Sequence, residues 1–189
     1  MSTKIVTIIV GVINNHKSKM GTLTPKIDPV REIIAKWYFK ELWGWNLEQI
    51  PTVEVLSSFL KSNLVAANGD GEISEEERKW IMGKGAAAGA PESLLKELES
   101  YSANEDITEV VARTPATDKS RKASIYFAVK AAASDGEYNE GEKATIRKMA
   151  QAMNISEEVV KQIEDLCLEE QRLKEKRIAI CYSEGNPFS

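Results

Sequence analysis

The sequence predicts an all-α fold, a helical bundle with an internal duplication of about 65 residues and an N-terminal extension. Three observations support this prediction. Apolar residues recur at spacings of three and four along most of the chain, which is the period of one helix face. Most of these segments begin at Ser, Thr, Asp or Asn, the residue types that cap helices best. An acidic stretch then occurs twice in the same helical context.

The duplication is clearest between Ala66–Glu77 and Ala131–Glu142, in which seven of twelve positions are identical. Aligned at Asp70 and Asp135, the two copies lie 65 residues apart (135 − 70). A repeat at a fixed separation indicates two related structural units. We therefore expect each half of the domain to have the order helix, acidic loop, helix, helix.

Residues 1–27 are expected to be an N-terminal segment and linker. Within them, the apolar run Ile5–Ile13 is too short to span a bilayer, and no signal-peptide cleavage site follows it. We interpret this run as a buried strand or a first helix. Cys167 and Cys181 are too few for a disulfide framework, so both thiols are expected to be reduced and the protein to be cytoplasmic.

Residues 28–177 are predicted to form the helical domain, with repeat halves at about 53–100 and 118–165. The expected helices start at these residues in turn: Asp28-Pro29, Thr52, Ser74, Pro91, Glu105, Thr117-Asp118, Asn139 and Ser156. The first is expected to stop at Gly44. Residues 178–189 contain Gly and Pro and are predicted to be an irregular tail.

The first helix carries an aromatic cluster that could line a ligand groove or pack in the core. Core packing is the favoured interpretation, because large aromatic side chains dominate the buried area of small helical domains. The cluster consists of Trp37, Tyr38, Phe39, Trp43 and Trp45.

The two acidic loops carry the oxygen ligands that calcium, magnesium and manganese prefer. Glu77 follows Asp70 by seven residues, as Glu142 follows Asp135, with a Gly directly after each Asp. In the register of an EF-hand loop, both copies have Ala where the first ligand belongs, so neither loop alone completes a calcium cage. We expect the two loops to meet across a pseudo-two-fold axis and to bring these four carboxylates around one or two divalent cations.

The repeated pattern Ala-x-x-Asp-Gly-Glu-x-x-Glu-x-Glu, at Ala67–Glu77 and Ala132–Glu142, resembles the TerB-like family of tellurite-resistance and stress-response modules. The resemblance covers about Val53–Arg177. It implies an all-helical bundle with a duplicated core and a metal site at the acidic positions. Carried over by this resemblance, the expected ligands are Asp70, Glu77, Asp135 and Glu142, with Glu72 and Glu137 beside them and Glu75 and Glu140 as helpers.

Three functions remain open at this point. The first is a non-enzymatic module that binds a divalent cation and presents a surface to a protein partner. The second is a metalloenzyme that uses the same carboxylates, with Lys130 or Tyr138 as an acid or base. The third is a metal-free scaffold in which the acids only cap helices and favour the helix dipole.

Composition narrows these functions further. A net charge of −4 argues against a nucleic-acid binder, because such proteins have basic faces. The chain has one histidine, His16, which excludes metal sites that need two or more. Cys167 lies on an apolar helix face and is interpreted as a core residue, so nucleophilic catalysis is not expected.

Overall fold

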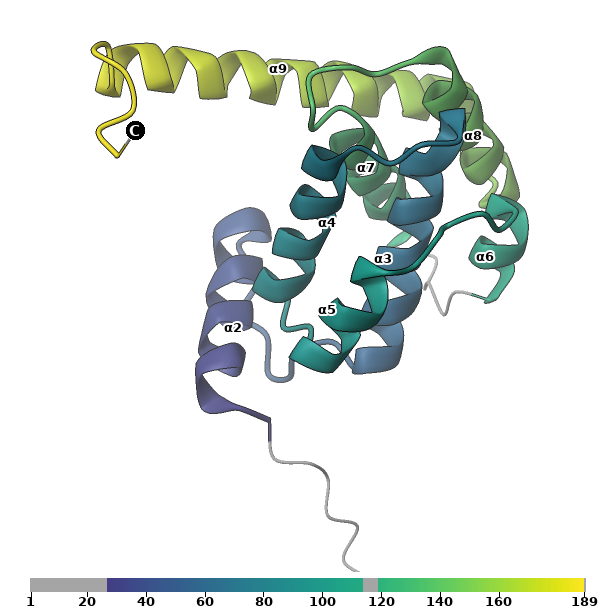
Figure 1. Cartoon of the computed structure of the whole chain (residues 1–189), viewed down its shortest axis with the longest axis horizontal. Helices are drawn as coiled ribbons and strands as arrows, with labels where there is room; N and C mark the ends of the chain where they lie inside the picture. The colour runs from purple at the N-terminus through teal and green to yellow at the C-terminus, as the bar shows by residue number, and fades with distance from the viewer. Residues whose placement is uncertain (1–26, 114–118, 189) are drawn as a thin grey trace, which may run out of the picture.

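The computed structural model describes residues 27–113 and 119–188. Within these ranges the chain is helical and contains no strand, which confirms the all-α prediction (Figure 1). The elements are α2 (Pro29–Trp43), α3 (Val53–Ala67), the short 3₁₀ helix η1 (Asn68–Asp70), α4 (Glu75–Ala87), α5 (Glu92–Glu99), α6 (Ile107–Arg113), α7 (Arg121–Ala132), α8 (Glu140–Ala152) and α9 (Glu157–Cys181). The expectations for Ile5–Ile13, His16 and the cap at Thr117-Asp118 lie outside the described residues.

The helix ends follow from local sequence. Asp28 accepts a hydrogen bond from Val30 N at 3.0 Å, and Thr52 Oγ1 accepts one from Val55 N at 3.3 Å. These caps satisfy backbone N–H groups that have no partner inside the helix. Gly44 ends α2 in the left-handed conformation with φ 72°, which glycine adopts without steric cost. The predicted starts of α2 and α3 and the predicted end of α2 are therefore confirmed.

The two halves of the bundle repeat the same order of elements. At the offset of 65 residues, α4 corresponds to α8 and α5 to the first turns of α9, because both pairs of helices begin at matched positions. Gly71 and Gly136, at matched positions in the two loops, have nearly equal φ values of 98° and 99°. The corresponding helices α3 and α7 pack against each other in the middle of the bundle.

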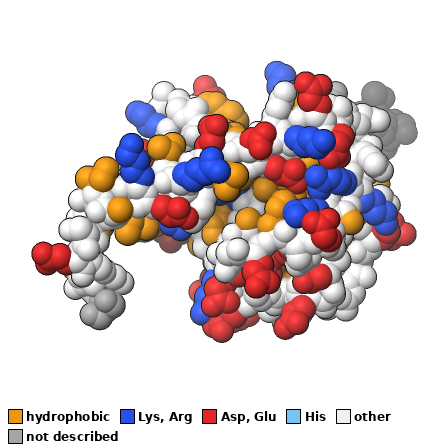
Figure 2. Space-filling view, turned by 90° about the horizontal axis from the view of Figure 1, so that it is seen from above, with side chains coloured by type: hydrophobic (Ala, Val, Ile, Leu, Met, Phe, Trp, Pro, Cys, Tyr) orange, Lys and Arg blue, Asp and Glu red, His pale blue; other side chains and the backbone are white. Residues whose placement is uncertain are grey.

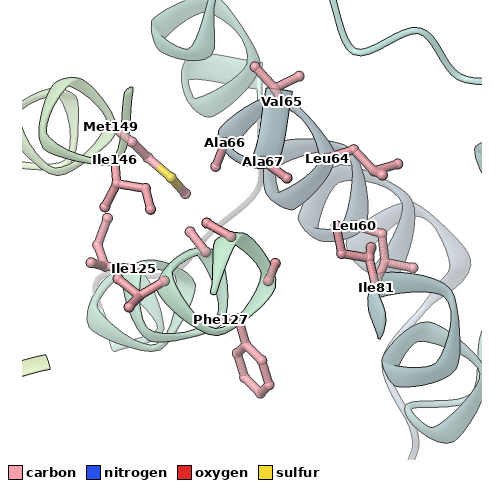
Figure 3. Close-up of a cluster of buried hydrophobic side chains, with 14 of the residues drawn as sticks. Leu60, Leu64, Val65, Ala66, Ala67, Ile81, Ile125, Phe127, Ile146 and Met149 are labelled. Atoms are coloured by element: carbon pink, nitrogen blue, oxygen red, sulfur yellow. The ribbon is translucent and has the colours of Figure 1, made fainter. Parts of the chain in front are cut away.

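The α3–α7 contact is close because small side chains line it. A group of alanines there is fully buried: Ala66, Ala67, Ala128, Ala131 and Ala132. Larger buried side chains surround this contact, among them Leu60 and Leu64 of α3, Ile125 and Phe127 of α7, and Ile146 and Met149 of α8 (Figure 3). Burial of this apolar surface is the main source of stability for the bundle.

The aromatic cluster near α2 is only partly in the core. Tyr38 is buried, but Trp37 and Trp45 keep 61% and 53% of their surface exposed. Core packing is therefore wrong for these two tryptophans. The reason is that α2 packs on α4 along one narrow face, through Ala35 and Tyr38, and turns Trp37 away from the bundle.

Helix α9 is longer than predicted. Residues 178–181 are helical rather than irregular, because no Gly or Pro interrupts the chain before Gly185. In Figure 1 the second half of α9 runs past the bundle as a projecting arm. Figure 2 shows hydrophobic side chains among charged ones along this arm, where Leu173 and Ile180 are 64% and 71% exposed. None of the helices among the described residues has the length and apolar character needed to cross a membrane.

The two acidic loops meet backbone to backbone at Gly69 and Gly141. A Cβ atom added at Gly69 would lie 2.6 Å from Glu142 Cα, and one added at Gly141 would lie 2.9 Å from Gly69 O. Real Cβ atoms do not approach backbone this closely, so only glycine permits the loops to touch here. This contact fixes the separation between the start of α8 and η1.

We predict that Gly69→Ala lowers the free energy of unfolding by about 1–3 kcal/mol, because the new methyl group forces two backbone segments apart. Gly83→Ala is the matched control. Gly83 lies inside α4 with open space around its Cα, so the same substitution should stabilise the helix by about 0.5–1 kcal/mol. Urea denaturation followed by circular dichroism measures both changes, and equal effects in the two variants would contradict the close contact.

Candidate functional site

Two capping boxes bring one glutamate of each half into the interior. In the first, Ser74 Oγ accepts from Glu77 N at 3.2 Å, and Glu77 Oε2 accepts from Ser74 N at 2.7 Å. In the second, Asn139 Oδ1 accepts from Glu142 N at 3.1 Å, and Glu142 Oε2 accepts from Asn139 N at 2.8 Å. Each carboxyl group folds back over its helix start, so Glu77 and Glu142 are only 2% and 3% exposed.

These two carboxyl groups share a hydrogen bond across the interface between the halves. Burial, followed by its hydrogen bond to Glu77, raises the pKa of Glu142 to about 8, since Glu142 is the donor. Burial also raises the pKa of Glu77. With both groups ionised, Glu77 Oε1 would be buried without a donor. The pair therefore holds one proton at neutral pH.

Asp70 and Asp135 lie on the exposed side of the pair, one in each loop. Their Oδ1 atoms accept from Glu72 N at 3.1 Å and from Glu137 N at 2.9 Å, which closes each loop into a tight turn. The negative charge of Asp70 raises the pKa of Glu142, and that of Asp135 raises the pKa of Glu77. Each aspartate thus acts on the glutamate of the opposite half.

The loops are joined by one hydrogen bond that the sequence did not predict. Asn139 Nδ2 donates to Asp70 Oδ2 at 2.8 Å, from the capping box of the second half to the loop of the first. The equivalent position in the first half is Ser74. The difference between Asn and Ser at matched positions was the available signal, because only Asn has an amide that can donate while its oxygen caps the helix.

The other predicted acids point away from the buried pair. Glu72 and Glu137 are exposed, and they take part in the loops through their backbone N–H groups. Glu75 and Glu140 form ion pairs with Lys79 at 2.5 Å and Lys143 at 2.6 Å on their own helices. Across residues 27–113 and 119–188, no three His, Cys, Asp or Glu side chains gather closely enough to hold a metal ion by themselves.

The residues considered for catalysis are held in other interactions. Lys130 Nζ lies 2.9 Å from Glu170 Oε2, and Tyr138 donates its hydroxyl hydrogen to Glu164 at 2.8 Å. Burial, followed by that hydrogen bond, raises the pKa of Tyr138. Cys167 is 7% exposed, and burial raises its pKa to about 12, so the thiol is a core group as predicted.

Comparisons with known proteins support the family and the fold of the chain. The model of a family described as proteins of unknown function, DUF533, matches residues 53–167, from the start of α3 into α9. The crystal structure of a tellurite resistance protein from Nostoc punctiforme is similar at 37% identity, with a TM-score of 0.74, over 85% of this chain and 99% of that chain. No curated protein matches the chain.

We predict that the shared proton makes the metal-free protein less stable as pH rises from about 4.5 to about 8. In this interval the folded protein binds more protons than the unfolded chain, because the pKa of Glu142 is raised on folding from its ordinary value of 4.5. The stabilisation that the raised pKa of Glu142 gives to the folded state is complete below pH 4.5 and is lost as pH rises to about 8. Over this interval the free energy of unfolding falls by up to about 1.4 kcal/mol per pH unit. Glu142→Gln should remove this dependence, because the amide donates to Glu77 at every pH.

Glu140→Gln is the matched control for this prediction. It removes the same charge from the same helix turn, but Glu140 is exposed and paired only with Lys143. Denaturant unfolding of the three proteins in a chelator, at pH 5, 6.5 and 8, provides the comparison. If the wild-type protein and Glu142→Gln keep the same pH slope, the carboxyl pair does not share a proton.

Proposed function

The chain belongs to the DUF533 family and has a TerB-like fold, and we propose that it is a divalent-cation-binding module whose ion is held by Glu77 and Glu142. One observation carries the proposal. Glu77 Oε1 is buried, faces a second carboxyl group and has no donor when both groups are ionised. Such an oxygen is stabilised either by a shared proton or by a bound cation.

The donor set fits a hard cation. Both inner groups are carboxylates, and the outer carboxylates of Asp70 and Asp135 add negative potential at the same place. Magnesium is usually bound by one or two carboxylates and keeps several waters, which suits a pair without a third nearby acid. Calcium and manganese remain candidates on the same chemistry. The bound ion would supply positive charge that lets both glutamates ionise inside the fold.

Cation binding at this pair is coupled to proton release. At neutral pH, Glu142 holds the shared proton and must give it up before both carboxylates can act as ligands. The occupancy of the site therefore depends on cation concentration and on pH together. Because the pair lies between the two halves, replacement of the shared proton by a cation changes the charge at their interface. Such a change suits a sensor or a buffer.

The similar protein from Nostoc punctiforme is a tellurite resistance protein, and we propose a role in the same process for this chain. Tellurite is an oxyanion, and a pair of carboxylates flanked by two aspartates repels anions. We therefore expect this site to contribute through a cation rather than by binding tellurite.

A non-enzymatic role is favoured over a metalloenzyme by the position of the apolar cavity described below. Among the described residues, that cavity is lined by none of the four acids, so the apolar pocket and the buried pair are separate. A metal-free scaffold is the other alternative, and the titration below separates it from a cation-binding module. A protein partner, the lack of nucleic-acid binding and a cytoplasmic location stay predictions.

We predict that chelator-stripped protein binds at least one of magnesium, manganese and calcium with release of a proton at pH 7. Calorimetry in buffers of different ionisation enthalpy measures both the affinity and the proton release. Glu77→Gln should weaken binding at least about tenfold, because it removes a buried charged ligand.

Glu75→Gln is the matched control, since it removes an exposed acid two positions away that pairs with Lys79. Asp70→Asn with Asp135→Asn should weaken binding less than Glu77→Gln, because these aspartates act from outside the buried pair. If none of the three ions gives a binding signal, the metal-free scaffold is favoured. If Glu77→Gln binds an ion as tightly as the wild type, the ion lies elsewhere.

A further inference from the structure

A cavity of about 340 Å³ lies between α2, α3, α4 and α7, and none of the four acids of the loops lines it. Its walls are mainly apolar and include several aromatic side chains, and its size falls within the range of small-molecule sites in proteins. The α2 side lies outside the family match, which begins at residue 53. The residues that matter for the argument are Tyr38, Phe39, Trp43, Phe59, Phe127 and Lys84.

The aromatic side chains that line the cavity pack against one another. Phe127 stands edge-on to Phe59 with ring centroids 5.3 Å apart, and Trp43 stands edge-on to Phe127 at 6.1 Å. Trp45 stacks on Trp43 at 5.6 Å and keeps half of its surface exposed. These contacts hold the rings in place and leave an apolar space beside a partly exposed tryptophan.

Lys84 is a charged group of this wall that forms no ion pair among the described residues. Its Nζ lies 5.4 Å from the centroid of the Tyr38 ring and 5.3 Å from that of Trp80, and the described residues give it no ion pair. Glu170, an acid whose charge acts on it, is engaged by Lys130 at 2.9 Å and by the Tyr126 hydroxyl at 2.8 Å.

The environment of Lys84 disfavours an unpaired positive charge. Burial lowers the pKa of Lys84, and the nearby positive charge of Lys130 lowers it further. Lys119, an exposed residue, adds a second ammonium group to the same cavity wall. An apolar cavity with unpaired cations at its wall is complementary to a ligand that carries one negative charge on an apolar body.

We propose that this cavity binds an amphipathic monocarboxylate, with its apolar body among the aromatic rings and its carboxylate at Lys84. The side chains of Trp43, Phe59 and Phe127 provide the apolar contacts, which account for most of the affinity. Lys84 provides the preference for an anion over a neutral or cationic molecule of the same shape. This proposal does not depend on cation binding at Glu77 and Glu142.

Tryptophan fluorescence tests the proposal, because Trp43 and Trp45 both line the cavity. The full-length protein is titrated with decanoate, decanol and decyltrimethylammonium, each below its aggregation concentration. We expect a saturable change with decanoate and at least tenfold weaker binding of the other two. Lys84→Met keeps the apolar stem but should reduce decanoate affinity to that of decanol.

Two further variants complete the experiment. Lys96→Met is the matched control, because Lys96 is an exposed lysine of α5 that pairs only with Glu92, and its decanoate affinity should equal that of the wild type. Ala123→Leu narrows the cavity from α7 and should weaken decanoate and decanol alike. The proposal is wrong if decanoate gives no saturable signal, or if Lys84→Met and Lys96→Met bind it equally well.

Discussion

The direct contact between the backbones at Gly69 and Gly141 is the constraint on which the acidic site depends. At this distance the start of α8 lies against η1, and the carboxyl groups of Glu77 and Glu142 interact across the halves. Any side chain at Gly69 would separate them. The two buried glutamates meet because the loops ahead of them touch, and the cross-loop bond from Asn139 to Asp70 maintains the same alignment.

The capping boxes give the site its chemical character. A capping glutamate is ordinarily solvated, and its role is to satisfy backbone N–H groups at a helix start. Here two such glutamates end up inside one interface, so the interaction that fixes each helix start also creates a buried pair of acids. Their pKa values rise because water is excluded and because like charges approach. Stability and the proposed cation binding therefore depend on the same four capping-box hydrogen bonds.

The parts of the structure that the sequence predicted well are those with local causes. The caps at Thr52, Ser74 and Asn139 and the stop at Gly44 depend on a few neighbouring residues, and the structure confirms them. The TerB-like fold could be expected from the repeated Asp-Gly…Glu pattern, which is hard to obtain by chance in two matched helical contexts.

The errors concern contacts between distant segments. The aromatic residues near α2 have the composition of a core, but the single face that α2 turns to α4 decides which rings are buried. For the acidic loops, the expectation of four carboxylates around one or two cations stays a prediction, and the capping geometry adds that Glu77 and Glu142 are buried while Asp70 and Asp135 lie at the surface. No local pattern reports which of two acids in a loop will be covered by the other half of the molecule.

The order of the site residues along the chain also matters for how the protein is made. Glu77 is synthesised long before Glu142, yet neither has its partner until the second half has docked on the first. A growing chain that ends before α8 has no shared proton and only half of the carboxyl pair. The acidic site is therefore a feature of the finished fold, and its proton uptake reports that translation and docking of both halves are complete.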